Sequence, residues 1–529
     1  MRLAAIFALL AALLSPAAVA QDSAPAAAAA AAARLHHLFD DEAPTPFLNG
    51  GALVRERGRM VFRSNMGFAD YRLRTRLTAD AVFQTASMAK PFTATAVLQL
   101  RDAGRLRLDD AVARHLPGFP FPGITIRHLL THTSGLPDLE LFEGLVAAQP
   151  DHVVTGADLI PALTAWKKPL ASSPGERFSY SNTNYQLLAL LVEKVSGRPF
   201  GSYVRAHIFA PAGMRSSYIL GTAPLAGPPK QMATSHVHAV MFRTDPEDPS
   251  ALDLGDARKM RPFRYELGNL GSTIGDQNLF TTLDDLARFD TALTAGRLLS
   301  RATQEEAYTP ARLNDGSSYL DAEEYQLYGV RCSYGLGWEV CRHPRYGRIV
   351  GHAGFNRGIF TMLYRNLDRR QFIAAFDNGD TSEFSARFAS VARVLNGEPA
   401  LAIERRRSLT RAYGEMLVRS GPTAALLLYN ELHAQDTTWA TTRGGMNALG
   451  YDLLRNGYPA LSLEPFRLNL VAFPNEAGGY DSYGEALAAN HALTDAALAY
   501  RRSLALNPEN ERGRQALKDI DERLRAPAK

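Results

Sequence analysis

A serine and a lysine stand three positions apart in the stretch QTASMAKPF, as Ser87 and Lys90. Residues at this spacing share one face of a helix, and Pro91 favours a helix start here. A serine hydroxyl becomes a nucleophile when a base removes its proton, and a lysine whose pKa is lowered by burial and nearby positive charge can be that base. The same letters also fit a serine N-cap followed by a solvated lysine. The spacing arises about once by chance in such a chain.

Two further short patterns carry polar groups suited to acyl transfer. Tyr180 and Asn182 offer a phenol and an amide in a loop before an expected helix, whereas His352 and Gly354 lie in a strand-like stretch. The glycine would let a substrate approach the backbone. Each pattern alone is a chance-level match. A second Tyr-x-Asn, at 364–366, lies within a strand-like run and is interpreted as structural.

The surrounding periodicity predicts the elements that would position these residues. Residues 51–70 contain two β-rich runs around an Arg-Gly pair, which predicts a hairpin. Helical spacing of apolar residues ends at a glycine in 92–104, 185–197 and 282–296. Strand patterns follow Tyr334. Strands at both ends with helices between them predict an α+β fold.

The order Ser-x-x-Lys, Tyr-x-Asn and His-x-Gly resembles that of the serine β-lactamase and penicillin-binding-protein superfamily. The tyrosine version is similar to the class C β-lactamase-related branch, which also holds esterases and D-amino-acid peptidases. Flanking segments at 124–138, 174–197 and 271–289 resemble that branch too. The resemblance implies an antiparallel sheet flanked by helices plus a helical subdomain, in a catalytic domain that we place at residues 46–400.

The resemblance also implies roles for the motif residues. Ser87 would attack a carbonyl and form an acyl-enzyme, with Lys90 as the base. Tyr180 would share the proton shuttle and help to activate the deacylating water. Asn182 would hold Lys90 or a substrate amide. The backbone N–H groups of Ser87 and Phe355 would bind the oxyanion.

A histidine, His352, stands where this superfamily also uses lysine. A lysine there is a permanent cation suited to the carboxylate of a β-lactam or a peptide C-terminus, whereas a histidine is largely uncharged near neutral pH. Antibiotic hydrolysis is therefore in doubt, and esters or amides without a free carboxylate are favoured. With that restriction, we expect Asn182, His352, Gly354 and Phe355 to bind the substrate.

The sequence predicts neither a metal nor an organic cofactor. His128 and His132 have the i, i+4 spacing that can bind zinc on a helix. No third ligand accompanies them. The resemblance implies instead that this segment is structural and lies near the site entrance.

The N-terminus has the layout of a secretory signal peptide. A positive start precedes an apolar run at 3–14 and small residues at 18–20. The alternative is an uncleaved membrane anchor, but the run is shorter than the about 20 residues that span a bilayer. We place the signal peptide at 1–20, followed by an alanine-rich linker at 21–45, and expect a periplasmic or secreted protein with no later membrane segment.

Charge and cysteine usage exclude other classes. The net charge of +4 is spread without long basic runs, so nothing indicates nucleic-acid binding. Cys332 and Cys341 are the only cysteines, too few for a disulfide framework or a cysteine metal cluster. The segment between them is strand-like and would hold the sulfurs roughly 25–30 Å apart. We therefore expect no bridge.

Residues 401–529 carry only helical patterns, which predicts an all-α repeat domain after the catalytic domain. Gly450 and Gly484 lie 34 positions apart, and two prolines share that spacing. A 34-residue period resembles the tetratricopeptide repeat, and 411–434 fits a third, degenerate helix pair. A plain helical bundle is the alternative. Repeats would offer a surface for a protein partner.

The motifs and the leader together predict an exported serine hydrolase that cleaves ester or amide bonds through an acyl-enzyme at Ser87. Its substrate would be a small-molecule ester, amide or peptide. A true β-lactamase or a cell-wall D,D-peptidase is the alternative among enzymes. A catalytically weak binding or scaffold protein acting through the C-terminal repeats is the alternative from another class.

Overall fold

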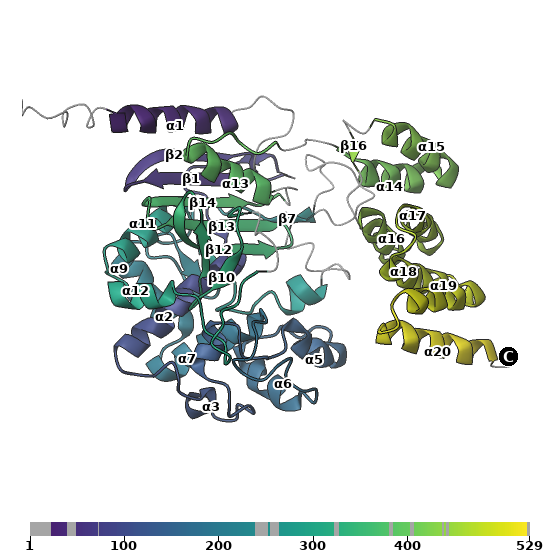
Figure 1. Cartoon of the computed structure of the whole chain (residues 1–529), viewed down its shortest axis with the longest axis horizontal. Helices are drawn as coiled ribbons and strands as arrows, with labels where there is room; N and C mark the ends of the chain where they lie inside the picture. Colours follow the sequence, from purple (N-terminus) through teal and green to yellow (C-terminus); the bar gives the residue numbers. More distant parts are fainter. Residues whose placement is uncertain are drawn as a thin grey trace, which may run out of the picture. The chain divides into compact units, whose positions relative to one another are not determined.

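The computed structural model describes residues 23–39, 49–71, 73–237, 252–253, 264–321, 327–379, 384–402, 407–435, 439–440 and 444–525 (Figure 1). The chain divides into two compact units. The first comprises Met1–Ala69, Thr75–Ser235 and Asn269–Ile403, and the second comprises Asp70–Arg74, His236–Gly268 and Glu404–Lys529. Every motif residue from Ser87 to Phe355 belongs to the first unit.

A seven-stranded antiparallel sheet forms the centre of the first unit, in the order β10-β11-β12-β13-β14-β1-β2. The predicted hairpin at 51–70 is confirmed as β1 and β2, and β1 pairs with β14 from the far end of the domain. The strands of this sheet are β1 (Gly50–Glu56), β2 (Arg59–Met66), β10 (Cys332–Tyr334), β11 (Glu339–His343), β12 (Gly347–Asn356), β13 (Ile359–Asn366) and β14 (Gln371–Asp377).

Helices cover both faces of the sheet, as Figure 1 shows. Successive side chains of a strand point to opposite faces, so the alternate residues Ala52 and Val54 lie on the same face. On that face they form one buried cluster with residues of α1 (Ser23–Phe39) and α13 (Phe384–Leu395). On the other face, α11 (Leu283–Thr294) packs against β1 and β14. The α+β fold with an antiparallel sheet is thus confirmed.

The helical part of the first unit lies between β2 and β10 in the chain. Its helices are α2 (Lys90–Asp102), α3 (Val112–His115), α4 (Ile126–Leu130), α5 (Glu143–Ala148), α6 (Leu159–Ala165), α7 (Asn182–Ser196), α8 (Phe200–Val204), α9 (Ala210–Ala212), α11 and α12 (Arg301–Ala307). Short strands in the same region are β3 (Phe68–Asp70), β4 (Thr75–Arg76), β5 (Phe83–Gln84), β6 (Tyr218–Ile219) and β9 (Leu279–Thr281).

Local sequence explains where the predicted helices begin and end. Gly197 adopts φ +72° just after α7, the left-handed conformation that ends a helix most easily when the residue is glycine. The hydroxyl of Thr282 accepts a hydrogen bond from the backbone N–H of Asp285 and so caps α11. The helices predicted at 185–197 and 282–296 are confirmed by α7 and α11.

The two cysteines form a disulfide, so the expectation of no bridge is wrong. The segment between them is a hairpin and not one extended strand, because a turn at 335–338 reverses the chain and Gly337 adopts φ +84° there. Cys332 and Cys341 therefore face each other as cross-strand partners, with a Cα–Cα distance of 4.4 Å.

The alanine-rich stretch expected to be a linker at 21–45 contains the helix α1. Leu35 and Phe39 of this helix are buried, and Phe39 stacks on Phe62 of β2 with ring centres 4.5 Å apart. Alanine has the highest helix propensity, and these larger residues give the helix a face that packs. The predicted signal peptide at 1–20 lies outside the described residues.

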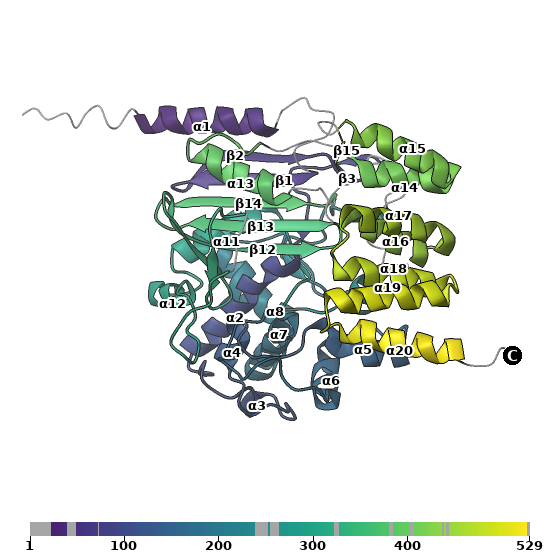
Figure 2. The ribbon, with the colours of Figure 1, turned by 45° about the vertical axis from the view of Figure 1, so that its right-hand side comes forward.

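The second unit is mainly helical. Three helix pairs stack in chain order, and α20 (Glu511–Arg525) follows the last of them, as seen in Figure 2. The pairs are α14 (Leu409–Ser420) with α15 (Pro422–His433), α16 (Gly445–Arg455) with α17 (Pro459–Ala472), and α18 (Ala477–Ala489) with α19 (Leu493–Leu506). Two-residue strands also occur in this unit, β7 (His236–Val237), β8 (Leu252–Asp253), β15 (Arg407–Ser408) and β16 (Trp439–Ala440).

Two glycines explain the close approach within successive helix pairs. A Cβ atom on Gly450 would lie 2.6 Å from the ring of Phe466, and one on Gly484 would lie 3.0 Å from the ring of Tyr500. Each glycine thus makes room for an aromatic ring 16 positions later, in α17 and α19. The 34-residue spacing read from the sequence therefore has a structural counterpart in these two pairs.

Among the described residues, no helix is both long and apolar enough to cross a membrane.

Candidate active site

Ser87 lies in the 3-10 turn η1 (Ala86–Ala89), which leads directly into α2. No side-chain cap hydrogen bond is made at the start of η1 or of α2, so Ser87 is not an N-cap. Ala86, just before it, has φ +45°. Such a conformation costs a residue other than glycine about 1–3 kcal/mol and persists only where the surroundings hold it.

Strand β12 holds this turn from one side. A Cβ atom on Gly354 would lie 2.5 Å from the carbonyl oxygen of Thr85 and 3.0 Å from the backbone nitrogen of Met88. The hydroxyl of Thr361, on the neighbouring strand β13, donates to the same Thr85 oxygen at 2.7 Å. Gly354 is therefore a glycine because β12 packs against the turn that carries Ser87, not because it contacts the pocket.

Lys90 is fully buried beneath Ser87 and contacts three oxygen atoms. Its Nζ lies 2.8 Å from Ser87 Oγ, 2.8 Å from Asn182 Oδ1 and 3.3 Å from the backbone oxygen of Asp276. A neutral amine has two hydrogens and one lone pair. The amide oxygen of Asn182 and the backbone oxygen of Asp276 can only accept. If the two hydrogens are donated to them, the lone pair faces the Ser87 hydroxyl.

The orientation of the Asn182 amide is set from below by Asp138. The Asp138 carboxylate accepts from Asn182 Nδ2 at 3.2 Å and from its backbone N–H at 2.6 Å. Because the amide nitrogen is used in this way, the amide oxygen points to Lys90. Burial raises the pKa of Asp138, and the hydrogen bonds from Asn182 oppose that rise.

Burial lowers the pKa of Lys90 from 10.5 to about 8. The carboxylates of Asp276, Asp138 and Glu339 act in the opposite direction and raise it. The expectation that nearby positive charge would lower this pKa is thus wrong, because the three charged groups that act most strongly on Lys90 are carboxylates. Burial outweighs these charges, and the resulting pKa makes Lys90 a base near neutral pH.

Tyr180 lies over Lys90, with Nζ 4.8 Å from the centre of its ring. Burial raises the pKa of the Tyr180 phenol well above its usual value, and a hydrogen bond with Ser87 opposes the rise. The phenol is therefore protonated at neutral pH. The residue nevertheless keeps 39% of its surface exposed and lines the pocket, which leaves it accessible to a substrate.

His132 supports Tyr180 from within the protein. The two rings stack at 4.2 Å, and His132 Nδ1 accepts from the backbone N–H of Ser181 at 3.2 Å. Burial lowers the pKa of this imidazole well below its usual value. Of the two histidines in the segment 124–138, His132 thus lies directly beneath Tyr180. Among the described residues, no group of three or more His, Cys, Asp or Glu side chains is arranged to hold a metal ion.

Both ring nitrogens of His352 have partners inside the protein. Nδ1 donates to the backbone oxygen of Ala353 at 2.6 Å, and Nε2 accepts from the Tyr334 hydroxyl at 2.9 Å. Burial lowers the pKa of His352 to about 3, and the charge of Lys90 acts in the same direction. The ring is therefore neutral and offers no charge to a substrate.

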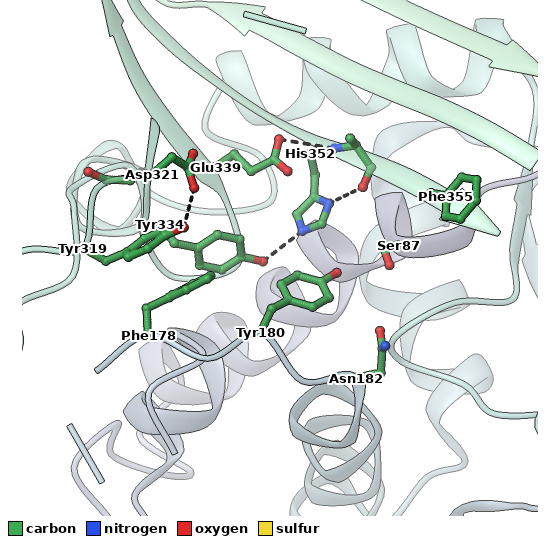
Figure 3. A pocket seen from close by; sticks show the side chains of 12 residues that line it. Ser87, Phe178, Tyr180, Asn182, Tyr319, Asp321, Tyr334, Glu339, His352 and Phe355 are labelled. Atoms are coloured by element: carbon green, nitrogen blue, oxygen red, sulfur yellow. Dashed lines mark hydrogen bonds between the residues drawn. The ribbon is translucent and has the colours of Figure 1, made fainter. Parts of the chain in front are cut away.

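A pocket of about 390 Å³ opens beside Ser87 (Figure 3). Five of the seven predicted site residues line it: Ser87, Tyr180, Asn182, His352 and Phe355. Lys90 and Gly354 lie behind this surface. The remaining lining residues are Phe178, Tyr319, Asp321, Ser333, Tyr334, Glu339 and Ala353.

The carboxylates of Asp138, Asp276, Asp321 and Glu339 at this site were not expected from the sequence. Burial raises the pKa of Glu339 to about 7 and that of Asp276 to about 6. Glu339 follows the turn of the β10–β11 hairpin and pairs with Tyr334 in that hairpin. An acidic residue within the otherwise apolar run around Glu339 was a sequence signal for a functional side chain. Without the turn of the hairpin, however, the sequence does not show that this side chain faces the pocket.

Comparison with known proteins agrees with this geometry. Residues 44–397 match the family described as Beta-lactamase. "Penicillin-binding protein 4*" of Bacillus subtilis (strain 168) is 31% identical over 408 residues, which cover 76% of this chain and 85% of that protein. A "D-aminopeptidase" of Brucella anthropi is 26% identical over 358 residues, 67% of this chain and 61% of that protein.

A solved structure shares the fold. The penicillin-binding protein from Bacillus halodurans superposes with a TM-score of 0.53 at 26% identity, and the match covers 69% of this chain and 98% of that one. The family match spans most of the chain and includes Ser87, Lys90 and the strand that carries His352. The chain therefore belongs to the β-lactamase and penicillin-binding-protein family of serine hydrolases.

Proposed function

We propose that the protein cleaves ester or amide bonds through an acyl-enzyme on Ser87, with Lys90 as general base. The observation that carries this proposal is the 2.8 Å contact between Lys90 Nζ and Ser87 Oγ, made by an amine whose pKa burial has lowered to about 8. A base poised near the working pH and within hydrogen-bond reach is what activation of a serine requires.

Acylation would begin as Ser87 Oγ bonds to the carbonyl carbon and its proton moves to Lys90 Nζ. The negative charge then falls on the carbonyl oxygen, which the backbone N–H groups of Ser87 and Phe355 would bind. The bond to the leaving group breaks as that group takes a proton from Lys90 through Tyr180. Lys90 ends neutral, and the acyl group stays on Ser87.

Deacylation would repeat these steps with water in place of Ser87. A water molecule gives its proton to the Tyr180–Lys90 pair while its oxygen bonds to the acyl carbon. The Ser87 ester bond then breaks, and Ser87 Oγ takes the proton back. Tyr180 suits this task because its phenol is protonated at neutral pH and exposed to the pocket.

The substrate is best described as an ester or amide without a free carboxylate near His352. A neutral His352 with both nitrogens occupied supports this choice. A β-lactamase or cell-wall D,D-peptidase is the second candidate, supported by the relatives named as penicillin-binding proteins. Its substrates carry the carboxylate that the first candidate excludes.

Export and a partner-binding role for the C-terminal helices complete the proposal. The leader-like residues 1–20 support a periplasmic or secreted location. The glycine–aromatic pairs in successive helix pairs support tetratricopeptide-like repeats. Such a stack would bind a protein partner, and its removal should leave turnover of small esters unchanged.

A fluorophosphonate probe tests the nucleophile directly. We expect a mass shift on the peptide that contains Ser87, lost in Ser87→Ala. Ser333→Ala is the matched control, since Ser333 lines the same pocket, and it should still be labelled. Absence of labelling in the wild type, or labelling that persists in Ser87→Ala, would contradict the proposal.

A substrate panel separates the two candidate functions. We expect turnover of 4-nitrophenyl esters or D-alanyl anilides to exceed that of a chromogenic cephalosporin. Cephalosporin turnover equal to ester turnover would favour the second candidate.

A further inference from the structure

The residues that line the pocket include two carboxylates and no lysine or arginine. The two carboxylates belong to Glu339 and Asp321. His352 is neutral, as shown above. Lys90 lies behind Ser87 and already contacts three oxygen atoms.

The carboxylate of Glu339 is fixed in place on one side. Its Oε2 accepts from the Tyr328 hydroxyl at 2.5 Å and from the backbone N–H of Ala353 at 3.3 Å. The second contact ties it to β12, one residue from His352. Among the described residues, none donates to Glu339 Oε1, so this oxygen can accept a hydrogen bond from a bound molecule.

Asp321 adds to the negative charge around Glu339. It accepts from the Tyr319 hydroxyl and from the backbone N–H of Cys332 at 3.2 Å. Its charge raises the pKa of Glu339, an effect added to burial and opposed by the charge of Lys90. A cation bound between these carboxylates would relieve their repulsion.

Aromatic rings form the rest of this wall, as Figure 3 shows. Phe178 stacks on Tyr319 at 3.9 Å and lies 5.6 Å from Tyr334. Aromatic faces attract organic cations and bury apolar groups. Carboxylates beside such rings suit an amine that carries an aromatic or aliphatic side chain.

We propose that the substrate carries a protonated amine and that Glu339 is the residue that selects it. This inference rests on the proposed function and names the substrate class for that site. The ammonium group donates to Glu339 Oε1 while its apolar part packs against Phe178 and Tyr334. Aminoacyl esters and amides with a free amine are therefore preferred to isosteric acyl groups without one.

Protection of Ser87 from a fluorophosphonate probe tests this inference without any turnover. We expect 2-phenylethylamine to slow labelling at a concentration at least about tenfold lower than 3-phenylpropionate does. The ammonium group of the amine would form a charge-assisted hydrogen bond with Glu339, whereas the carboxylate of 3-phenylpropionate would be repelled by it. In Glu339→Gln this difference should fall below about threefold. Glu143→Gln, an exposed carboxylate outside the pocket, is the matched control and should retain it.

Turnover gives a second readout. L- and D-phenylalanine methyl esters are compared with methyl 3-phenylpropionate, which differs only in lacking the amine. We expect the ratio of kcat/KM to favour an amine ester by tenfold or more in the wild type and to fall in Glu339→Gln. Labelled Ser87 with equal protection by both ligands would overturn the inference and leave the proposed function standing. Failure to label Ser87 would instead refute the proposed function.

Discussion

The reactivity of Ser87 should follow the titration of Lys90. With a pKa of about 8, Lys90 is neutral in about one tenth of the molecules at pH 7, in half at pH 8 and in about nine tenths at pH 9. An ordinary lysine with a pKa of 10.5 would be neutral in only about 0.3% of the molecules at pH 8. Burial thus increases the reactive fraction by roughly 150-fold at that pH, the equivalent of about 3 kcal/mol.

The assay is the second-order rate of fluorophosphonate labelling between pH 6 and 10, followed by intact mass. We expect one rise with its midpoint near pH 8. His352 does not titrate in this range because its pKa is about 3, and Tyr180 stays protonated because its pKa is raised well above 10. Glu339 and Asp276 have pKa values of about 7 and about 6, so they lose their protons below the midpoint expected for Lys90.

Variants identify the group that titrates. Lys90→Ala should lower the plateau rate by about 100- to 10,000-fold, the usual contribution of a general base, and should remove the rise near pH 8. Asp276→Asn removes the carboxylate that most raises the Lys90 pKa, so the midpoint should move to lower pH. A wild-type midpoint above pH 10, or a midpoint near pH 8 that survives in Lys90→Ala, would refute this assignment.

Three further predictions concern stability. Gly354→Ala should lower the free energy of unfolding by about 1–3 kcal/mol, because the new Cβ atom would meet the backbone of Thr85 and Met88. A lower melting temperature and slower Ser87 labelling would show this. Gly144→Ala, whose Cβ atom would lie in open space, should change neither the melting temperature nor the labelling rate in this way. Replacing Cys332 and Cys341 by alanine should cost about 2–3 kcal/mol, the loop-closure value for a separation of 9 residues; reductant should lower the melting temperature of the wild type and leave the double variant unchanged. Gly450→Ala should destabilise the helical unit, because the new Cβ atom would meet the ring of Phe466. Gly478→Ala should stabilise α18 by up to about 1 kcal/mol, because the new Cβ atom would have no atom near it. Equal denaturation midpoints for the two variants would contradict this.

Much of the fold could be predicted because it depends on local signals. Helix α7 ends at Gly197, which adopts the left-handed conformation, and α11 begins after Thr282, whose side chain caps its first turn. The β1–β2 hairpin was visible in two β-rich runs around a tight turn. The pairing of β1 with β14 could not be read in this way, because it joins residues more than 300 positions apart.

The disulfide shows how one wrong local interpretation spreads. Residues 333–340 have the composition of a strand, and a straight strand would separate the cysteines. The turn at 335–338 depends on Gly335 and Gly337, whose Cβ atoms would meet Ala307 and Ala94. The two glycines were the local signal for a turn, whereas the contacts with α12 and α2 that require glycine cannot be read from the sequence around the cysteines.

The candidate site was predictable in its chemistry and not in its charge. The family resemblance implied that Asn182 would hold Lys90, and the structure places Lys90 Nζ 2.8 Å from both Ser87 Oγ and Asn182 Oδ1. The carboxylates of Asp138 and Asp276, which lie far from Lys90 in the sequence, raise the pKa of the same lysine. Nothing in their spacing from Lys90 marks them as partners.

These carboxylates give the buried lysine its strength as a base. Burial alone would lower the pKa of Lys90 further, and an amine with a much lower pKa would be neutral at every working pH but a poor proton acceptor. Asp276, Asp138 and Glu339 raise that pKa again, and the balance at about 8 keeps both the neutral fraction and the basicity useful. Because Glu339 also faces the pocket, an ammonium bound to it would cancel part of its charge and lower the pKa of Lys90. A cationic substrate would then increase the neutral fraction of Lys90, the base that activates Ser87. The charge of the pocket would in this way help to control the reactivity of the serine.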